Sequence, residues 1–209
     1  MNILDQFKKI YNSFTNIPNI PQDLKDIKEP KVLHISDTPV SYHSFIYKVI
    51  EELMPDYLIH TGDLVDNLKM EFNHQLKDAY EVRAASFIKQ LESLPLKKIF
   101  IIPGNHDDLQ ILKDYCKRII ILEEGMNLTL ENIIINVAHH PRNLGNNAHY
   151  YLYGHNFQSI PKIQDQVFLN GLNKMHVILL STNKVIPIDY PYGINQDRKM
   201  YSNTTKGGM

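Results

Sequence analysis

"KKIFIIPGNHDD", residues 97–108, joins an apolar run directly to a cluster of polar side chains. The first part, 97–103, has the length and the branched apolar residues of a buried strand. Asn105, His106 and Asp107 follow where that strand should end. Burying polar groups there is costly unless they find partners. The stretch therefore predicts a strand whose end carries a functional site, and it raises the question of what the asparagine and the histidine do.

The same arrangement of an apolar run followed by polar residues recurs along the chain. We expect strands over 31–36, 56–62, 97–103, 118–125 and 149–157, and helices over 41–54, 69–94 and 108–116. We also expect a strand pair within 126–141 and terminal strands within 166–190. Alternation of strand and helix in the first half predicts parallel strands with crossover helices. Ligand sites of open α/β sheets form at the carboxyl ends of such strands.

Five of the expected strand ends carry side chains that can bind a metal ion. They are Asp37, Asp63, Asn105 with His106, His139 with His140, and His155. These groups are carboxylates, a carboxamide and imidazoles, with no thiolate among them. Such a donor set suits Mn, Fe or Zn better than a structural thiolate zinc site. Loops of very different lengths separate the candidates, so only the fold can bring them together.

Five short stretches in this order carry a resemblance to a known family. They are HISDTP (34–39), IHTGDLVD (59–66), IPGNHDD (102–108), AHHP (138–141) and YGHNF (153–157). Over residues 31 to about 190 the chain resembles the calcineurin-like metallophosphoesterases, and five motifs in order are a strong signal. The resemblance implies an α/β fold, a four-layer α/β/β/α sandwich of two mixed sheets flanked by helices.

The resemblance also implies an activity and a set of metal ligands. Two metal ions can activate a water molecule and clamp the phosphate of a phosphoester. Asp63 would bridge the two ions. Asn105, His139 and His155 would complete one site, and Asp37 would begin the other.

Two further residues receive roles from the resemblance. His106 would stabilise the transition state or protonate the leaving oxygen, and Asp107 would orient its ring. The opening question then has an expected answer: Asn105 is a ligand and His106 acts on the substrate.

The sequence departs from the family pattern at two positions. Pro39 and Phe157 stand where the family has histidines. Both missing imidazoles belong to one metal site, which keeps only Asp37 and Asp63. Three consequences are open: one strong ion with a weak or absent second one, a substitute ligand such as His43 or His149, or a scaffold that binds without turnover.

Simpler explanations exist for individual residues. Asp37 could cap the following helix, Asp63 could be a turn residue, and Asn105 could occupy a left-handed turn position. For the pair His139 and His140, the resemblance favours His139 as the ligand.

The tyrosines of 150–153 could line a pocket for a base or an aryl group. They could also alternate between the core and the surface of a strand.

Composition limits the remaining choices. The chain has 209 residues, a formal net charge of −1 and one cysteine, Cys116. No intrachain disulfide can form, which fits a reducing compartment. The N-terminus predicts an amphipathic helix over 2–14 without the features of a signal peptide. We therefore expect a cytoplasmic protein of a bacterial or virus-infected cell, with a helix and linker over 1–30, one domain over 31–194 and a flexible tail over 195–209.

The leading hypothesis is a phosphoesterase that uses one or two divalent ions, Mn, Fe or Zn, on a phosphodiester or small nucleotide-like substrate. The alternative is a catalytically impaired scaffold with a protein partner. We expect no membrane association. Nucleic acid is a weaker candidate because the net charge gives no electrostatic footprint. A basic stripe built from Lys97, Lys98, Arg142 or Lys162 would revive it.

Overall fold

The computed structural model describes residues 17–161, 163 and 165–200. The helix expected over 2–14 lies outside this range. Two mixed β-sheets form the centre of the fold, as expected. The larger sheet has the strand order β10-β9-β1-β2-β3-β4, in which β1 to β4 are parallel, β9 is antiparallel to β1, and β10 is antiparallel to β9. Its strands are β1 (Lys31–Ile35), β2 (Tyr57–His60), β3 (Lys98–Ile101), β4 (Ile119–Ile121), β9 (Met175–Leu179) and β10 (Lys184–Ile188).

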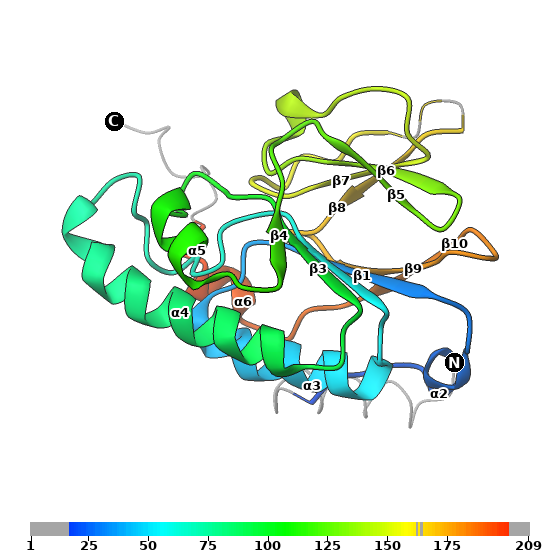
Figure 1. Ribbon diagram of the computed structural model, residues 1–209, viewed down its shortest axis with the longest axis horizontal. Helices are drawn as coiled ribbons and strands as arrows, with labels where there is room; N and C mark the ends of the chain where they lie inside the picture. Colours follow the sequence, from blue (N-terminus) through cyan, green and yellow to red (C-terminus); the bar gives the residue numbers. More distant parts are fainter. Residues whose placement is uncertain (1–16, 162, 164, 201–209) are drawn as a thin grey trace, which may run out of the picture.

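The smaller sheet has four strands in the order β5-β6-β7-β8. They are β5 (Asn127–Leu130), β6 (Ile133–Val137), β7 (Tyr150–Tyr153) and β8 (Val167–Asn170). The β5–β6 pair is antiparallel, and β7 is parallel to both of its neighbours. The two sheets lie against each other (Figure 1).

Among the described residues, helices form a layer on the six-stranded sheet, whereas the second helical layer of the expected four-layer sandwich is not formed. The helices are α2 (Gln22–Asp26), α3 (His43–Leu53), α4 (Lys77–Ser93), α5 (Leu109–Tyr115) and α6 (Ile194–Asp197), with single 3₁₀ turns η1 (Val40–Tyr42), η2 (His74–Leu76) and η3 (Pro141–Asn143). In Figure 1, α3, α4 and α5 cover the face of the six-stranded sheet that points away from the smaller sheet. Within the described residues, no α-helix covers the outer face of the smaller sheet. None of the described helices is long and apolar enough to cross a membrane.

Each face of the larger sheet packs into a separate core. In β1, Leu33 and Ile35 join the core beneath the helices, whereas Val32 joins the core between the two sheets. Successive side chains of a strand point to opposite faces, so β1 is buried on both sides. This explains why the parallel strands read as unbroken apolar runs in the sequence.

Backbone hydrogen bonds join the loops that follow the parallel strands. The N–H of Asp37 donates to the carbonyl of Gly62 and that of Thr38 to the carbonyl of Asp63, each at 2.9 Å. On the smaller sheet, the N–H of Gly154 donates to the carbonyl of His139 at 3.0 Å. The loops after β1 and β2, and those after β6 and β7, are therefore held together in pairs.

Two boundaries differ from those expected. The helix expected over 69–94 begins only at Lys77, because the Asn73 side chain accepts a hydrogen bond from the N–H of Gln75 at 3.1 Å and starts the separate turn η2. The packed structure also continues past residue 194, since α6 is formed and Arg198 is fully buried. Within the segment expected as a linker, Leu24 of α2 is buried in the helix-covered core.

Candidate active site

Three ligand candidates from different loops meet at one point. Asn105 Oδ1 lies 2.9 Å from His139 Nε2 and 3.0 Å from His155 Nδ1, and the two imidazole nitrogens are 3.2 Å apart. Asp63 Oδ2 lies 3.5 Å from the same nitrogen of His139. Donor atoms of mixed O and N type that converge in this way could hold one metal ion.

Two hydrogen bonds orient these ligands. His139 Nδ1 lies 2.7 Å from the carbonyl oxygen of Thr61, which accepts its proton and leaves Nε2 free to face the cluster. Asn105 Nδ2 donates to Glu71 Oε2 at 2.5 Å, so its oxygen points toward the histidines. Nothing in the sequence pattern indicates a role for Glu71, which lies in a stretch expected to be helical.

Asp37 and Asp63 add two buried carboxylates to the cluster. A ligand atom of each lies within 4.8 Å of the other and of a ring nitrogen of His139. Burial raises the pKa of Asp63 to about 7, although the nearby His139 opposes the change. Burial lowers the pKa of His139, but Asp63 and Asp37 outweigh it and raise the value to about 9. A bound cation would remove the cost of ionising these carboxylates, so the residues present fit a divalent metal.

Asp66 brings a further carboxylate that the sequence reasoning missed. It is fully buried, and Lys69 Nζ pairs with its Oδ1, while Oδ2 has no hydrogen-bond partner among the described residues. One of its oxygens lies within 4.8 Å of ligand atoms of Asp63 and His106. Burial and the charges of Asp37 and Asp63 raise the pKa of Asp66 to about 8. The sequence feature that could have indicated a place for Asp66 in the site is its position three residues after Asp63.

The two positions that lack histidine supply no metal ligand. Pro39 precedes η1, and the Phe157 side chain is 45% exposed. The suggested substitutes are engaged elsewhere. His43 is buried, stacks on Phe87 and places Nε2 2.9 Å from the carbonyl oxygen of Leu64. His149 accepts a hydrogen bond at Nδ1 from the N–H of Ile134. Neither histidine joins the cluster.

Asp107 connects the two ligand-bearing turns. Its Oδ2 accepts hydrogen bonds from the N–H groups of Asp63 and Gly104, both at 2.8 Å. Its Oδ1 accepts from the N–H of Leu64 at 2.9 Å and from the Tyr80 hydroxyl at 2.8 Å. None of these donors belongs to the ring of the neighbouring histidine. Asp107 therefore holds the backbone of the site, and the expected role of orienting that ring is not seen.

His106 lies at the edge of the cluster. Its N–H donates to Asp63 Oδ1 at 2.9 Å, and its ring nitrogen Nδ1 accepts weakly from the N–H of Glu71 at 3.4 Å. Phe72 packs against the ring, with the centroids 5.6 Å apart. Burial and the charge of Lys69 lower the pKa of His106 to about 4, so the ring is uncharged at neutral pH.

An open pocket of about 380 Å³ leads to the ligands. It is lined by Glu71, Pro103, Gly104, Asn105, Glu124, His139, His140, Arg142, Asn143 and His155. His140 lies on its wall and packs against His155 with the rings tilted and their centroids 4.3 Å apart, while His139 belongs to the cluster itself. The tyrosines of β7 are buried and do not line this pocket.

Residues 30–183 match the sequence profile of the calcineurin-like phosphoesterases. The chain belongs to this family. Among solved structures, an archaeal phosphodiesterase is similar, with 17% identity, a TM-score of 0.52, and 76% of this chain and 98% of that chain covered. Yfce, a phosphoesterase from E. coli, is similar with 15% identity, a TM-score of 0.51 and coverage of 77% and 99%. At these identities the likeness shows the fold. No curated protein matches this chain.

Membership of the calcineurin-like phosphoesterases supports a hydrolase that acts on phosphoesters with divalent metal ions. The aspartates and histidines of the pocket form groups that can hold such an ion.

Proposed function

We propose that this protein is a metal-dependent phosphoesterase that hydrolyses a phosphodiester or a small nucleotide-like ester from one strong metal site. The observation that carries the proposal is the meeting of Asn105 Oδ1, His139 Nε2 and His155 Nδ1 within 3.2 Å of one another, in an open pocket. The family supplies the reaction class. The geometry of this chain supplies the site at which the reaction would occur.

Asn105, His139 and His155, together with Asp63, would hold the strong ion, for which Mn, Fe and Zn are the candidates. Bound there, the ion would lower the pKa of a water molecule and neutralise charge on the phosphoryl oxygens. Asp63 would face a second ion as well. That ion would have Asp37 as its other ligand from the family pattern, so we expect it to bind more weakly.

His106 would act on the leaving group. Its ring lies next to Asp63 and the ligands but outside the meeting point of Asn105, His139 and His155. An N–H donor held at that position can stabilise the negative charge that develops on a leaving oxygen by a hydrogen bond, which an uncharged imidazole can donate.

The scaffold alternative predicts a closed pocket with Phe157 buried beside it. The exposed Phe157 and the open pocket favour the enzyme instead. The nuclease alternative needs a basic stripe across the pocket. Arg142 lines the pocket together with Glu71 and Glu124, whereas Lys97 pairs with Asp56 beside the opposite end of β3. Lys162 lies outside the described residues.

Metal removal is the direct test of the proposed function. Protein stripped with a chelator should hydrolyse bis(p-nitrophenyl) phosphate at the background rate, because without the ion nothing activates the water molecule or neutralises charge on the phosphate. Addition of Mn²⁺, Fe²⁺ or Zn²⁺ should restore turnover. A monoester, p-nitrophenyl phosphate, run in parallel separates the two ester classes. Folded protein that binds metal but shows no turnover with either substrate would favour the scaffold alternative.

Phe72 supports a substrate with a flat leaving group. Its side chain is 77% exposed although it contacts the ring of His106. An exposed aromatic side chain beside the leaving-group donor offers a stacking surface for a base or an aryl group.

We expect Phe72→Ala to weaken binding of aryl esters by about 1 kcal/mol or more, roughly a fivefold rise in KM. The KM for an alkyl diester should change little. The measurement compares KM for the two esters in the variant and in Val82→Ala, which removes an exposed apolar side chain of α4. Equal losses for aryl and alkyl esters would contradict stacking.

A further inference from the structure

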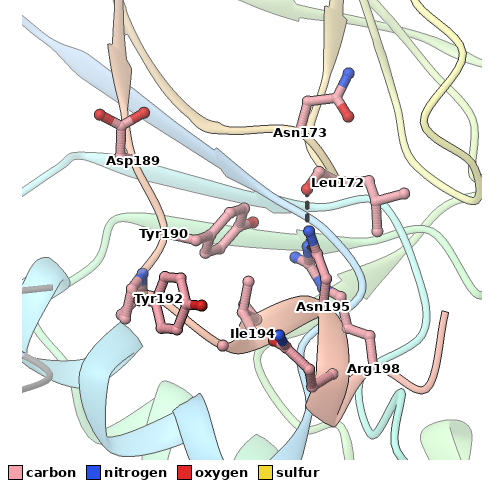
Figure 2. A pocket seen from close by; sticks show the side chains of 11 residues that line it. Leu172, Asn173, Asp189, Tyr190, Tyr192, Ile194, Asn195 and Arg198 are labelled. Carbon is pink, nitrogen blue, oxygen red and sulfur yellow. Dashed lines mark hydrogen bonds between the residues drawn. The ribbon is translucent and has the colours of Figure 1, made fainter. Parts of the chain in front are cut away.

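Arg198 is a fully buried cation that lies beyond the end of the family match at residue 183. Its Nε donates to the carbonyl of Asp37 at 2.6 Å, and its Nη2 donates to the carbonyl of Ser36 at 3.1 Å. Its Nη1 donates to the carbonyl of Leu172 at 2.8 Å (Figure 2). The guanidinium group thus joins the residue after α6 to the turn that follows β1.

The surroundings of Arg198 hold it without neutralising it. The guanidinium carbon lies 4.5 Å from the centre of the Tyr190 ring, and Nη1 also donates to Asn195 Oδ1 at 3.0 Å. Among the described residues, no carboxylate forms an ion pair with Arg198. A buried charge without a counter-ion is costly to the fold. The hydrogen bonds of the guanidinium to backbone carbonyls, which a neutral apolar residue could not make, must therefore offset this cost.

Those contacts fix the backbone of a proposed metal ligand. Asp37 has a φ of 53°, a left-handed conformation that non-glycine residues seldom adopt and that the surrounding structure must hold. Arg198 donates to the carbonyls of the two peptide groups that flank the Cα of Asp37. On the other side, the Asp37 carboxylate accepts hydrogen bonds from Ser36 Oγ and from the N–H of His155. Both the backbone and the carboxylate of Asp37 are therefore set in place before any ion arrives.

We propose that Arg198 is a positioning residue for the second metal ion. Pro39 and Phe157 leave that ion with Asp37 and Asp63 as its family-pattern ligands, so its binding depends on how rigidly Asp37 is held. Arg198 supplies this rigidity from a segment outside the family match. This inference rests on the proposed function for the existence of the second ion.

The test is a calorimetric titration of metal-free protein with Mn²⁺. The wild type should bind one ion strongly and a second more weakly. Arg198→Lys keeps the charge but loses the fork of donors, and Arg198→Met loses both. We expect the weaker affinity to fall about 10- to 100-fold, the range seen when partners of metal ligands are removed, with the stronger affinity unchanged and Arg198→Lys less affected than Arg198→Met.

Two controls separate positioning from general stability. Arg118 also donates to backbone carbonyls, at the end of α4, so Arg118→Lys repeats the chemistry away from the site. Asn136 is buried in the smaller sheet and donates to the carbonyls of Gly125 and Met126. Asn136→Ala should therefore destabilise the protein away from Asp37, and it controls for a general loss of stability. Neither variant should change the weaker affinity.

Three results would overturn the proposal. They are a wild type that binds a single ion, Arg198 variants with unchanged affinities, and an equal loss of affinity in Asn136→Ala. If both Arg198 variants fail to fold, Tyr190→Leu removes the ring against the guanidinium together with the hydroxyl that donates to the carbonyl of Gly171 and contacts Ser36. This variant should weaken binding of the second ion in the same direction. Since the titration does not require turnover, a protein that binds two ions but hydrolyses nothing would overturn the proposed function and leave this inference intact.

Discussion

Replacing His106 by glutamine should lower kcat for a chromogenic phosphodiester by about 10²- to 10⁴-fold, the usual contribution of a positioned acid or donor. The ring is next to Asp63 and Phe72 but outside the group formed by Asn105, His139 and His155. Its hydrogen bond to Asp63 comes from the backbone N–H, which the substitution keeps. The effect should therefore fall on kcat, while the affinity for the strong ion, measured by titration, stays at the wild-type value.

His140→Gln is the matched control for this variant. It removes an imidazole from the wall of the pocket that leads to the metal-ligand candidates, where the ring packs against His155. We expect a small change in kcat and normal metal content. If His106→Gln lost the metal and the activity together, the histidine would be a ligand, and the assignment of a leaving-group role would be wrong.

The sequence was sufficient to locate the cluster because the fold is built on parallel strands. Asp37, Asp63 and Asn105 each follow a run of apolar residues, and the carboxyl ends of β1, β2 and β3 lie at one edge of a sheet. That rule brings residues far apart in the sequence together without any knowledge of loop structure. The two mixed sheets and flanking helices implied by the resemblance were confirmed.

The parts that the sequence did not predict depend on contacts between side chains and backbone groups. Glu71 and Phe72 reach the site because the chain from 69 to 73 turns over the cluster instead of forming the first turns of a helix. Arg198 lies in a polar stretch whose composition indicates a frayed end, and only its contacts with distant carbonyls show that it is part of the fold. Periodicity carries no information about such contacts.

Asp107 illustrates the same limit within a recognised motif. Its position beside His106 suggested that the carboxylate orients the ring. Both oxygens are instead occupied by three backbone N–H groups and one hydroxyl. Adjacency in the sequence was a poor guide here because neighbouring side chains of a tight turn can point in different directions.

Replacing Asp107 by alanine should therefore destabilise the whole protein as well as the site. The change would leave the N–H groups of Asp63, Leu64 and Gly104 and the Tyr80 hydroxyl without their common acceptor. Each buried unsatisfied polar group costs about 1–3 kcal/mol, so we expect a loss of about 3 kcal/mol or more in the free energy of unfolding. For a chain of this size that corresponds to a fall in Tm of roughly 6–12 °C, measurable by thermal denaturation of the metal-free protein.

Asp108→Ala is the adjacent control. Asp108 caps α5 by accepting hydrogen bonds from the N–H groups of Gln110 and Ile111 at 2.9 and 3.1 Å. Losing this cap should cost about 1 kcal/mol and leave metal affinity unchanged. Asp107→Ala should reduce the affinity for both ions, because the turns that carry Asp63 and Asn105 lose the two hydrogen bonds that Asp107 makes between them. An Asp107→Ala protein with normal Tm and metal affinity but a lower kcat would contradict this reading, and it would assign the carboxylate to the histidine ring after all.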